Sequence, residues 1–315
     1  MSRTDDLFAL FDKRTANDVQ GMDSMLHFFE DIPVDDSTTL GMGSGGSFSH
    51  QSPSANEQAR PADAPAIRAT VVALVSVNGG VGRSTLATAV SSGLQRLGRS
   101  VVALDLDPQN ALYHHFGLRH TLPGIGRTSL QNQRWDQILQ PGFAGCQVIT
   151  FGETDIRQQE DLQRWLKQQQ GWLGQNLAAL GLSDQHTVII DTPAGNNPYL
   201  HQALNVADVV LIIGQADAAS LGTLEQMEQL LAPHLARDLP PRCHFVINQL
   251  DETSGFSLDM VEVFRKRLGQ NLLEVVHRDS AISEALAFGS DPLDSEATSM
   301  ACDDIHELCR LLLRS

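Results

Sequence analysis

The sequence predicts a doubly wound α/β fold, with a mostly parallel sheet covered by helices on both faces. From residue 69 onward, short apolar runs rich in Val and Ile, without polar alternation, are followed by segments of helical periodicity. A glycine-rich segment, residues 79–82, separates the first apolar run from the first helical segment. With 315 residues, 42% of them hydrophobic, the chain is long enough for one such domain of about 250 residues and an extension.

The expected elements alternate along the chain. Strands are predicted near residues 70–77, 100–105, 146–151, 186–190, 208–213, 243–248 and 272–276. Helices are predicted around residues 84–97, 158–180, 220–235, 256–268, 279–288 and 301–313. Because parallel strands present their carboxyl ends at one edge of the sheet, we expect the ligand site at that edge.

Residues 1–67 differ in composition from the predicted domain, which spans residues 68–315. They contain eleven Asp and Glu against four Lys and Arg, so −7 of the net charge of −16 lies there. Apolar residues have helical spacing in residues 7–11 and 19–29, and Gly, Ser and Pro are frequent in residues 41–65. We expect a largely disordered, tethered extension with one or two short amphipathic helices. It is either a partner-docking motif that folds on binding or a plain acidic tail, and its acidity disfavours direct membrane attachment.

The net charge of −16 argues against broad nucleic-acid binding, because phosphate neutralisation dominates that affinity. The four cysteines are scattered without a Cys-x-x-Cys pair, which is typical of reduced thiols in a cytoplasmic protein. No apolar run approaches the roughly 20 residues that span a bilayer. We therefore expect a cytoplasmic protein that reaches the inner membrane or a cell pole only through partners.

Most of the functional information lies in one segment, Val77-Asn78-Gly79-Gly80-Val81-Gly82-Arg83-Ser84-Thr85. It follows an apolar strand and opens a helix. Glycines let backbone N–H groups turn inward, and a helix N-terminus adds partial positive charge, so such a loop binds phosphate. Compared with the phosphate-loop pattern Gly-x-x-x-x-Gly-Lys-Ser/Thr, the segment has Val77 at the first glycine and Arg83 at the lysine.

Two further motifs place carboxylates at strand ends. Asp105 and Asp107 lie at the end of the second predicted strand, and Asp191 ends the fourth. A carboxylate in this position holds a magnesium-bound water near the phosphates of a nucleotide. Each aspartate alone has an ordinary alternative role as a helix cap or a turn residue. Their order, spacing and strand context together favour a nucleotide site.

These three motifs resemble those of the ParA/MinD (SIMIBI) family of P-loop ATPases, over about residues 69–315. In that family the loop reads Lys-Gly-Gly-x-Gly-Lys-Ser/Thr-Thr, Asp-x-Asp-Pro-Gln forms switch I, and Asp-Thr-Pro-x-Gly forms Walker B and switch II. The resemblance implies ATP and Mg²⁺ as ligands, with Asp107 orienting the attacking water. It also implies that Ser84 binds the metal directly and Asp191 through water. The nucleotide-binding residues that it implies are Asn78, Gly79, Gly80, Val81, Gly82, Arg83, Ser84 and Thr85, with Asn248 recognising adenine.

The carboxyl-terminal third narrows the resemblance to the cellulose-biosynthesis (BcsQ) subfamily. Residues 275–285 contain His277-Arg278-Asp279, as in that subfamily, and Phe151-Gly152 follows the third predicted strand. This resemblance implies an ATP-dependent homodimer that regulates or assembles the bacterial cellulose synthase complex, contacting its subunits or a small accessory protein. Residues 1–67 are not covered by it.

The loop lacks both lysines of the ParA/MinD family. There, the first lysine reaches the phosphates of the other subunit in an ATP-sandwiched dimer, and a charge in such a position contributes on the order of 10³–10⁵ in rate. Asn78 is neutral and short, and the planar fork of Arg83 differs from a compact ammonium. We therefore expect nucleotide binding with slow or weak hydrolysis. The alternative is that Arg127 or Arg278 supplies the missing charge in trans.

The main alternative function is a ParA/MinD-type partition or positioning ATPase that acts on DNA or on a cell-pole or membrane cargo, against which the net charge argues. An electron-transfer ATPase would need paired cysteines at strand ends, and a small-molecule kinase would need a phosphate-clamping lysine. We find neither in the sequence. The C-terminal pattern of Ile305, Leu308, Cys309 and Leu312 predicts a packed core helix rather than a membrane anchor.

Overall fold

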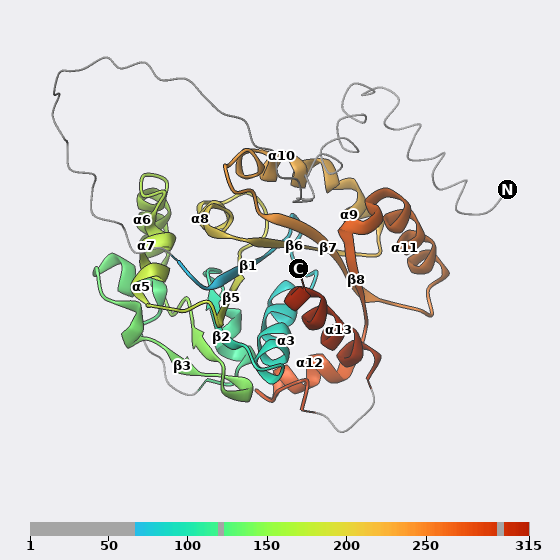
Figure 1. Cartoon of the computed structure of the whole chain (residues 1–315), viewed down its shortest axis with the longest axis horizontal. Helices are drawn as coiled ribbons and strands as arrows, with labels where there is room; N and C mark the ends of the chain where they lie inside the picture. Colours follow the sequence, from blue (N-terminus) through green and yellow to red (C-terminus); the bar gives the residue numbers. More distant parts are fainter. Residues whose placement is uncertain (1–66, 119–122, 295–298, 315) are drawn as a thin grey trace, which may run out of the picture. The chain divides into compact units, whose positions relative to one another are not determined.

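The computed structural model describes residues 67–118, 123–294 and 299–314. In this part of the chain, eight strands form one sheet in the order β3-β4-β2-β5-β1-β6-β7-β8 (Figure 1). All neighbouring strands run parallel except β3, which pairs antiparallel with β4. The prediction of a doubly wound, mostly parallel α/β fold is confirmed. The predicted extension, apart from Ile67, lies outside the described residues.

The strands lie within a few residues of their predicted positions. Their bounds are β1 (Thr70–Val75), β2 (Ser100–Asp105), β3 (Gln140–Pro141), β4 (Gln147–Ile149), β5 (His186–Asp191), β6 (Val209–Gln215), β7 (Arg242–Leu250) and β8 (Leu272–His277). The helices are α3 (Arg83–Arg96), α4 (Ala111–His115), α5 (Ile125–Leu130), α6 (Ile156–Leu166), α7 (Trp172–Ala179), α8 (Pro198–Val206), α9 (Ala218–Gly222), α10 (Leu224–Leu235), α11 (Gly255–Leu268), α12 (Ser280–Ala287) and α13 (Met300–Arg314). The predicted helix 220–235 is divided into α9 and α10, and β3, α4, α5 and α8 were not predicted.

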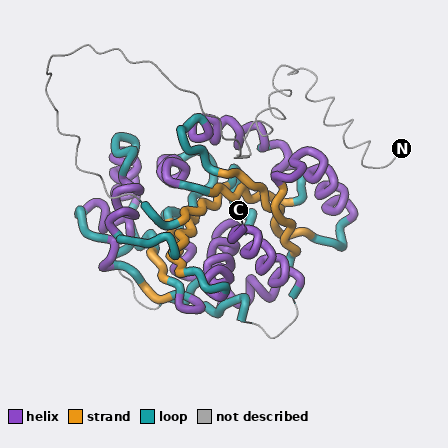
Figure 2. Tube along the Cα trace, viewed as in Figure 1, coloured by secondary structure: helices purple, strands orange, loops and turns teal. Residues whose placement is uncertain are grey.

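Helices cover both faces of the sheet, with α3, α12 and α13 on one face and α8, α10 and α11 on the other (Figures 1 and 2). The central strand β1 is buried on both faces, which explains why its sequence shows no polar alternation. Helix α3 follows β1 and packs against β2 and β5. This arrangement places the residue 77–85 segment, called the glycine loop below, at the carboxyl ends of the strands.

The C-terminal helix α13 is a core element. Ile305, Leu308 and Cys309 are buried, and the helix packs against α3 and β8. Gly93 of α3 permits this close approach, because a Cβ at that position would lie 2.6 Å from Cys309 Sγ. The predicted packed helix is confirmed. Over the described ranges, no helix is long and apolar enough to cross a membrane.

The segment predicted as one helix, residues 158–180, instead forms α6 and α7. The side chain of Gln202, on α8, occupies the break between them. Its Nε2 donates to the carbonyls of Leu166 (3.4 Å) and Gln169 (2.7 Å), and its Oε1 accepts from the Leu173 N–H (3.2 Å). A buried amide from another helix thus satisfies backbone groups that a continuous helix would satisfy itself. Helical periodicity indicates the apolar face but not this interruption.

Candidate functional site

The glycine loop connects β1 to α3. Gly80 and Gly82 have φ values of 77° and 82°, in the left-handed region that favours glycine. Gly82 is the N-cap residue of α3, and no side chain caps this helix, so the N–H groups of its first turn face a ligand position. Gly79 and Gly80 are exposed, with open space beside each of them. The loop can therefore hold an anion at its solvent-exposed side.

Asn248 supports the glycine loop from β7. Its Nδ2 donates to the Val81 carbonyl at 2.8 Å, and the residue is buried. A Cβ on Gly82 would lie 2.3 Å from this nitrogen, so the contact requires glycine there. The next residue, Gln249, has a φ of 60° and accepts a hydrogen bond from Gln215 at 3.0 Å. The amide predicted to recognise adenine thus lies beside the loop, and the loop backbone already uses one of its N–H groups.

Three aspartates, Asp105, Asp107 and Asp191, gather beside the glycine loop and are called the aspartate cluster below. Asp105 and Asp191 are neighbours in register at the ends of β2 and β5, and both are fully buried. Asp105 accepts N–H bonds from Asp107 (2.9 Å) and Leu112 (3.0 Å). Burial raises the pKa of Asp105 well above its usual value, and the negative charge of Asp191 raises it further. The sheet thus joins the carboxylates of two motifs that are far apart in the sequence.

Arg83 points into the aspartate cluster. Its Nε donates to Asp191 Oδ1 at 3.0 Å, its Nη1 to Ser76 Oγ at 2.5 Å, and its Nη2 to Asp107 Oδ2 at 3.4 Å. The exposed fraction is 7% for Arg83 and 0% for Asp191. Burial raises the pKa of Asp191, and the opposing effects of Arg83 and the Ser84 hydroxyl do not cancel this increase. The guanidinium is therefore directed at the carboxylates and not at the solvent-exposed side of the loop.

Ser84 and Asp191, the predicted metal site, lie close together. The Ser84 hydroxyl is near enough to lower the pKa of Asp191, and the Oδ2 atom of Asp191 is buried without a hydrogen-bond partner among the described residues. A hydroxyl and a carboxylate are ligands that Mg²⁺ takes, with waters and phosphate oxygens at its other positions. In the described ranges, no group of three or more His, Cys, Asp or Glu side chains could hold a metal. The donors fit an ion that arrives with a nucleotide, but the charge of Arg83 lies beside them.

Ser76, which no motif singles out, links three parts of the site. Its hydroxyl accepts from Arg83 and donates to the Asn78 carbonyl at 2.8 Å, and its own carbonyl accepts from the Gly195 N–H at 3.0 Å. The segment after Asp191 is thereby tied to the end of β1. The only sequence signal for this role is a hydroxyl residue directly before the glycine loop. Thr85, predicted to contact phosphate, is half-buried in the first turn of α3.

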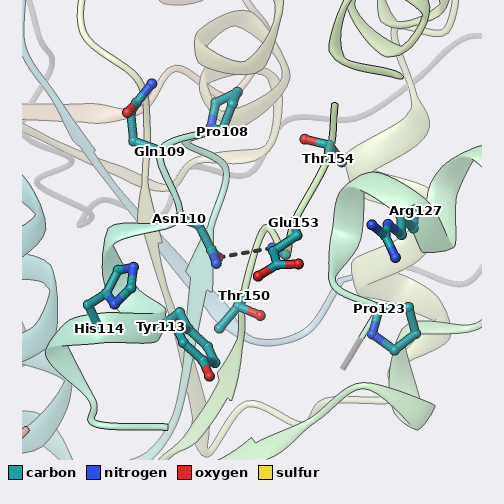
Figure 3. Close-up of a pocket in the computed structure, with 11 residues that line it drawn as sticks. Pro108, Gln109, Asn110, Tyr113, His114, Pro123, Arg127, Thr150, Glu153 and Thr154 are labelled. Atoms are coloured by element: carbon teal, nitrogen blue, oxygen red, sulfur yellow. Dashed lines mark hydrogen bonds between the residues drawn. The ribbon is translucent and has the colours of Figure 1, made fainter. Parts of the chain in front are cut away.

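A cavity of about 410 Å³ opens beside the loop that follows Asp107 (Figure 3). Asn110, in this loop, accepts a hydrogen bond from the Gly152 N–H at 2.9 Å. Arg127 on α5 and Glu153 after β4 line the cavity. Arg127 is exposed and has no ion-pair partner within the described part of the chain. The loop called switch I is thus joined to the segment after β4 through Asn110, which sequence reasoning missed.

A second cavity, of about 570 Å³, lies at the carboxyl ends of β7 and β8. His277 lines it and hydrogen-bonds with Asp304 (2.7 Å) and Glu252 (3.0 Å). Burial lowers the pKa of His277, but the two carboxylates more than offset this effect and the pKa is raised. The neighbouring Arg278 is exposed. Arg127 and Arg278, the two candidates for a charge in trans, therefore line different cavities on opposite sides of β1 in the sheet order.

Residues 69–313 match the family described as cellulose biosynthesis protein BcsQ. The chain belongs to this family. A BcsQ protein of Salmonella typhi is 27% identical over 245 residues, covering 77% of this chain and 94% of that protein. A chromosome partitioning protein ParA of Caulobacter vibrioides is 26% identical over 238 residues, covering 71% and 86%.

Solved structures share the fold of this BcsQ-family chain. The septum site-determining protein MinD of Pyrococcus horikoshii, complexed with Mg-ADP, has a TM-score of 0.65 and 18% identity, covering 78% of this chain and 96% of that one. A plasmid partition protein of Borrelia burgdorferi bound to AMPPNP has a TM-score of 0.66 and 16% identity, covering 78% and 99%. The predicted ParA/MinD-type fold and the BcsQ resemblance are confirmed.

Proposed function

We propose that this BcsQ-family chain is an ATP-binding switch in bacterial cellulose synthesis. ATP promotes a homodimer, and the dimer regulates or assembles subunits of the cellulose synthase complex, directly or through a small accessory protein. Membership in the BcsQ family supports the process, and the glycine loop beside the aspartate cluster supports the nucleotide. The protein works in the cytoplasm and reaches the membrane through its partners.

The proposed slow hydrolysis rests on the hydrogen bonds of Arg83 to Asp191 and Asp107. Backbone N–H groups of the glycine loop and the start of α3 bind the α- and β-phosphates, with Thr85 beside them. Neither position that holds a lysine in the ParA/MinD pattern offers a free cation, because Asn78 is neutral and Arg83 bonds Asp191 and Asp107. Charge that develops on the transferred phosphoryl group is then poorly compensated. We therefore expect ATP to bind and to be hydrolysed weakly.

The remaining predicted residues keep their proposed roles. Asp107 orients the attacking water, although its Oδ1 accepts from the Gln109 N–H at 2.9 Å and its Oδ2 from Arg83. A carboxylate held on both oxygens has little freedom to accept a proton, which also favours slow turnover. In this proposal Ser84 and Asp191 would hold a magnesium ion carried by ATP, and Asn248 would recognise the base.

The test is the light-scattering molar mass of the full chain with and without ATP, with phosphate release measured on the same samples. A doubling from 34.3 kDa with little phosphate released supports an ATP-locked dimer. Rapid phosphate release contradicts slow hydrolysis, and Arg127→Ala and Arg278→Ala would then identify which arginine acts in trans. Constant mass together with no bound nucleotide contradicts the switch.

The alternative function is a partition ATPase that acts on DNA, since ParA proteins are among the relatives. The net charge of −16 opposes it. Fluorescence anisotropy of a labelled DNA duplex at low salt, with ATP present, distinguishes the two. We expect no binding, and saturable binding that weakens with salt would favour the partition role.

Residues 1–67 form, in this proposal, an acidic tether that docks a partner. Deleting residues 1–66 should leave ATP affinity unchanged and weaken partner capture. The measurements are nucleotide titration and pull-down of cellulose synthase subunits with the full and shortened chains. A shortened chain that fails to fold would show that the tether interpretation is wrong.

A further inference from the structure

We propose that His277 is a positioning residue of the nucleotide site: as an imidazolium it fixes the loop after β7, so that the chain binds ATP more tightly with His277 protonated than with His277 neutral. The inference rests on the proposed ATP site and specifies how that site is regulated. His277 acts through Asn248, which supports the glycine loop, and the inference requires no contact between His277 and the nucleotide.

Both ring nitrogens of His277 face a carboxylate. Nδ1 lies 2.7 Å from Asp304 Oδ2, which also accepts the His277 backbone N–H at 2.9 Å, and Nε2 lies 3.0 Å from Glu252 Oε1. A neutral imidazole has one N–H and an imidazolium has two, whereas an ionised carboxylate can only accept. Both bonds therefore form together only when His277 is protonated. The Glu252 side chain is 54% exposed and that of Asp304 19%, so a neutral ring keeps its proton toward Asp304 and releases Glu252 to water.

The surroundings of His277 favour its protonated form. Burial lowers the pKa of His277, but the two bonded carboxylates more than offset this effect and raise the pKa above its ordinary value of 6.5. The bond to Glu252 is therefore fully present below about pH 6.5 and is lost as pH rises through the folded pKa. Among the described residues around the ring, on α13, β8 and the loops after β7 and β8, acidic side chains outnumber cations: Asp304, Glu252, Asp251, Glu274 and Asp279, against Arg278.

An irregularity in β7 presents Asn248 to the glycine loop. The register between β7 and β8 is broken between Ile247 and Leu250, and it resumes where Leu250 pairs with His277. Asn248 lies within this break, and its Nδ2 donates to the Val81 carbonyl at 2.8 Å. The position of Asn248 therefore depends on the contacts that fix the far end of the break.

The end of β8 fixes that end of the break in two ways. The Arg278 N–H donates to the Leu250 carbonyl at 2.9 Å, whatever the charge of the ring. The bond from His277 to Glu252 links the following loop, through Asp304, to α13, which packs against β8 and α3 (Figure 1). Only this second link needs the ring proton. Its loss loosens the loop and the break before it, and weakens the support that the glycine loop receives from β7.

The experiment is a titration of the full chain with a fluorescent ATP analogue and MgCl₂, followed by anisotropy, at about pH 6 and about pH 9. For the natural chain we expect the dissociation constant to rise about threefold between the two, the size expected of a half-exposed ion pair. Glu252→Gln should bind tightly at both pH values, because an amide can donate to a neutral Nε2 and accept from a protonated one. His277→Asn keeps a donor for Asp304 but is too short to reach Glu252, so it should bind weakly at both.

The matched control is His306→Gln, because His306 also lies on the C-terminal side of the domain, on α13, but does not line the cavity around His277. It should show the pH dependence of the natural chain. Titration of the ATP phosphates is common to all variants, so differences between them isolate the effect of the ring.

The outcomes separate this inference from the proposed function. Equal pH dependence in the natural chain and in Glu252→Gln overturns the inference and leaves the ATP site standing. Binding by His277→Asn as tight as that of the natural chain at the lower pH does the same. No binding by any variant at either pH overturns the ATP site and the inference with it. If circular dichroism shows that His277→Asn is unfolded, Glu252→Gln, which changes one exposed side chain, decides the result.

Discussion

Replacing Arg83 by methionine tests what stabilises the aspartate cluster in the folded chain. Arg83→Met keeps an unbranched side chain but removes the guanidinium that bonds Asp191 at 3.0 Å and Ser76 at 2.5 Å. Asp191 is fully buried, Arg83 bonds its Oδ1, and its Oδ2 has no hydrogen-bond partner among the described residues. The variant therefore leaves a buried carboxylate without an opposite charge beside it.

The size of the effect follows from the contact distance and the burial. Two unit charges 3.0 Å apart attract by about 5.5 kcal/mol at an effective dielectric constant of about 20. Desolvation of both ions offsets part of this, and removing one partner of a buried pair costs about 3–5 kcal/mol. Asp107, at 3.4 Å and with a side chain 14% exposed, adds little. We expect Arg83→Met to lower the free energy of unfolding by about 3 kcal/mol.

The assay is urea unfolding followed by circular dichroism, with Arg83→Met compared with the Arg83→Met/Asp191→Asn double variant. The double variant has no uncompensated buried charge, so we expect it to recover more than half of the loss. Burial already raises the pKa of Asp191, and loss of Arg83 raises it further. In the folded single variant Asp191 then binds a proton more tightly than in the unfolded chain. The stability that this variant loses relative to the natural chain therefore grows as pH rises through the folded pKa and shrinks as pH falls. A loss below about 1 kcal/mol, or a double variant no more stable than the single one, would refute the reasoning.

Gly82→Ala should destabilise the chain more than Gly98→Ala. Both glycines have a positive φ (82° and 91°), but only at Gly82 would the new Cβ clash with Asn248. Equal losses of stability in urea unfolding would contradict this prediction. Burial lowers the pKa of His234 from 6.5 to about 4, so the unfolded chain binds a proton there before the folded chain does. Relative to His234→Gln, the natural chain should therefore lose more than about 1 kcal/mol of stability as pH falls from about 6.5 to about 4, and parallel pH profiles would show that the argument is wrong. Iodoacetamide should label Cys302 first in the native chain, because burial raises the pKa of the other three thiols to about 12. The order of labelling is measured by mass spectrometry, and earlier labelling of another cysteine would contradict the prediction.

The strands of the sheet were predictable because each depends mainly on residues within it. Apolar runs mark all the predicted strands, and the structure contains each of them. The strand that was missed, β3, consists only of Gln140–Pro141, which pair with residues of β4. Two residues are too few to show any periodicity. The break between α6 and α7 was missed for a different reason. It depends on Gln202, which reaches the break only after α8 has packed against α6 and α7.

The candidate site also has features that depend on local sequence and features that depend on the folded chain. The order and spacing of residues within the sequence were sufficient for the fold class, the family, the glycine loop and the strand-end aspartates, because these motifs are local. The direction of the Arg83 side chain and the placement of Asn248 against Val81 depended on the folded chain. The carboxylates that attract Arg83 lie at the end of β5 and in the loop after β2, and they become neighbours only when β2, β5 and β1 lie side by side in the sheet. A buried guanidinium bonds the carboxylates nearest to it, and the order of strands in the sheet decides which carboxylates those are.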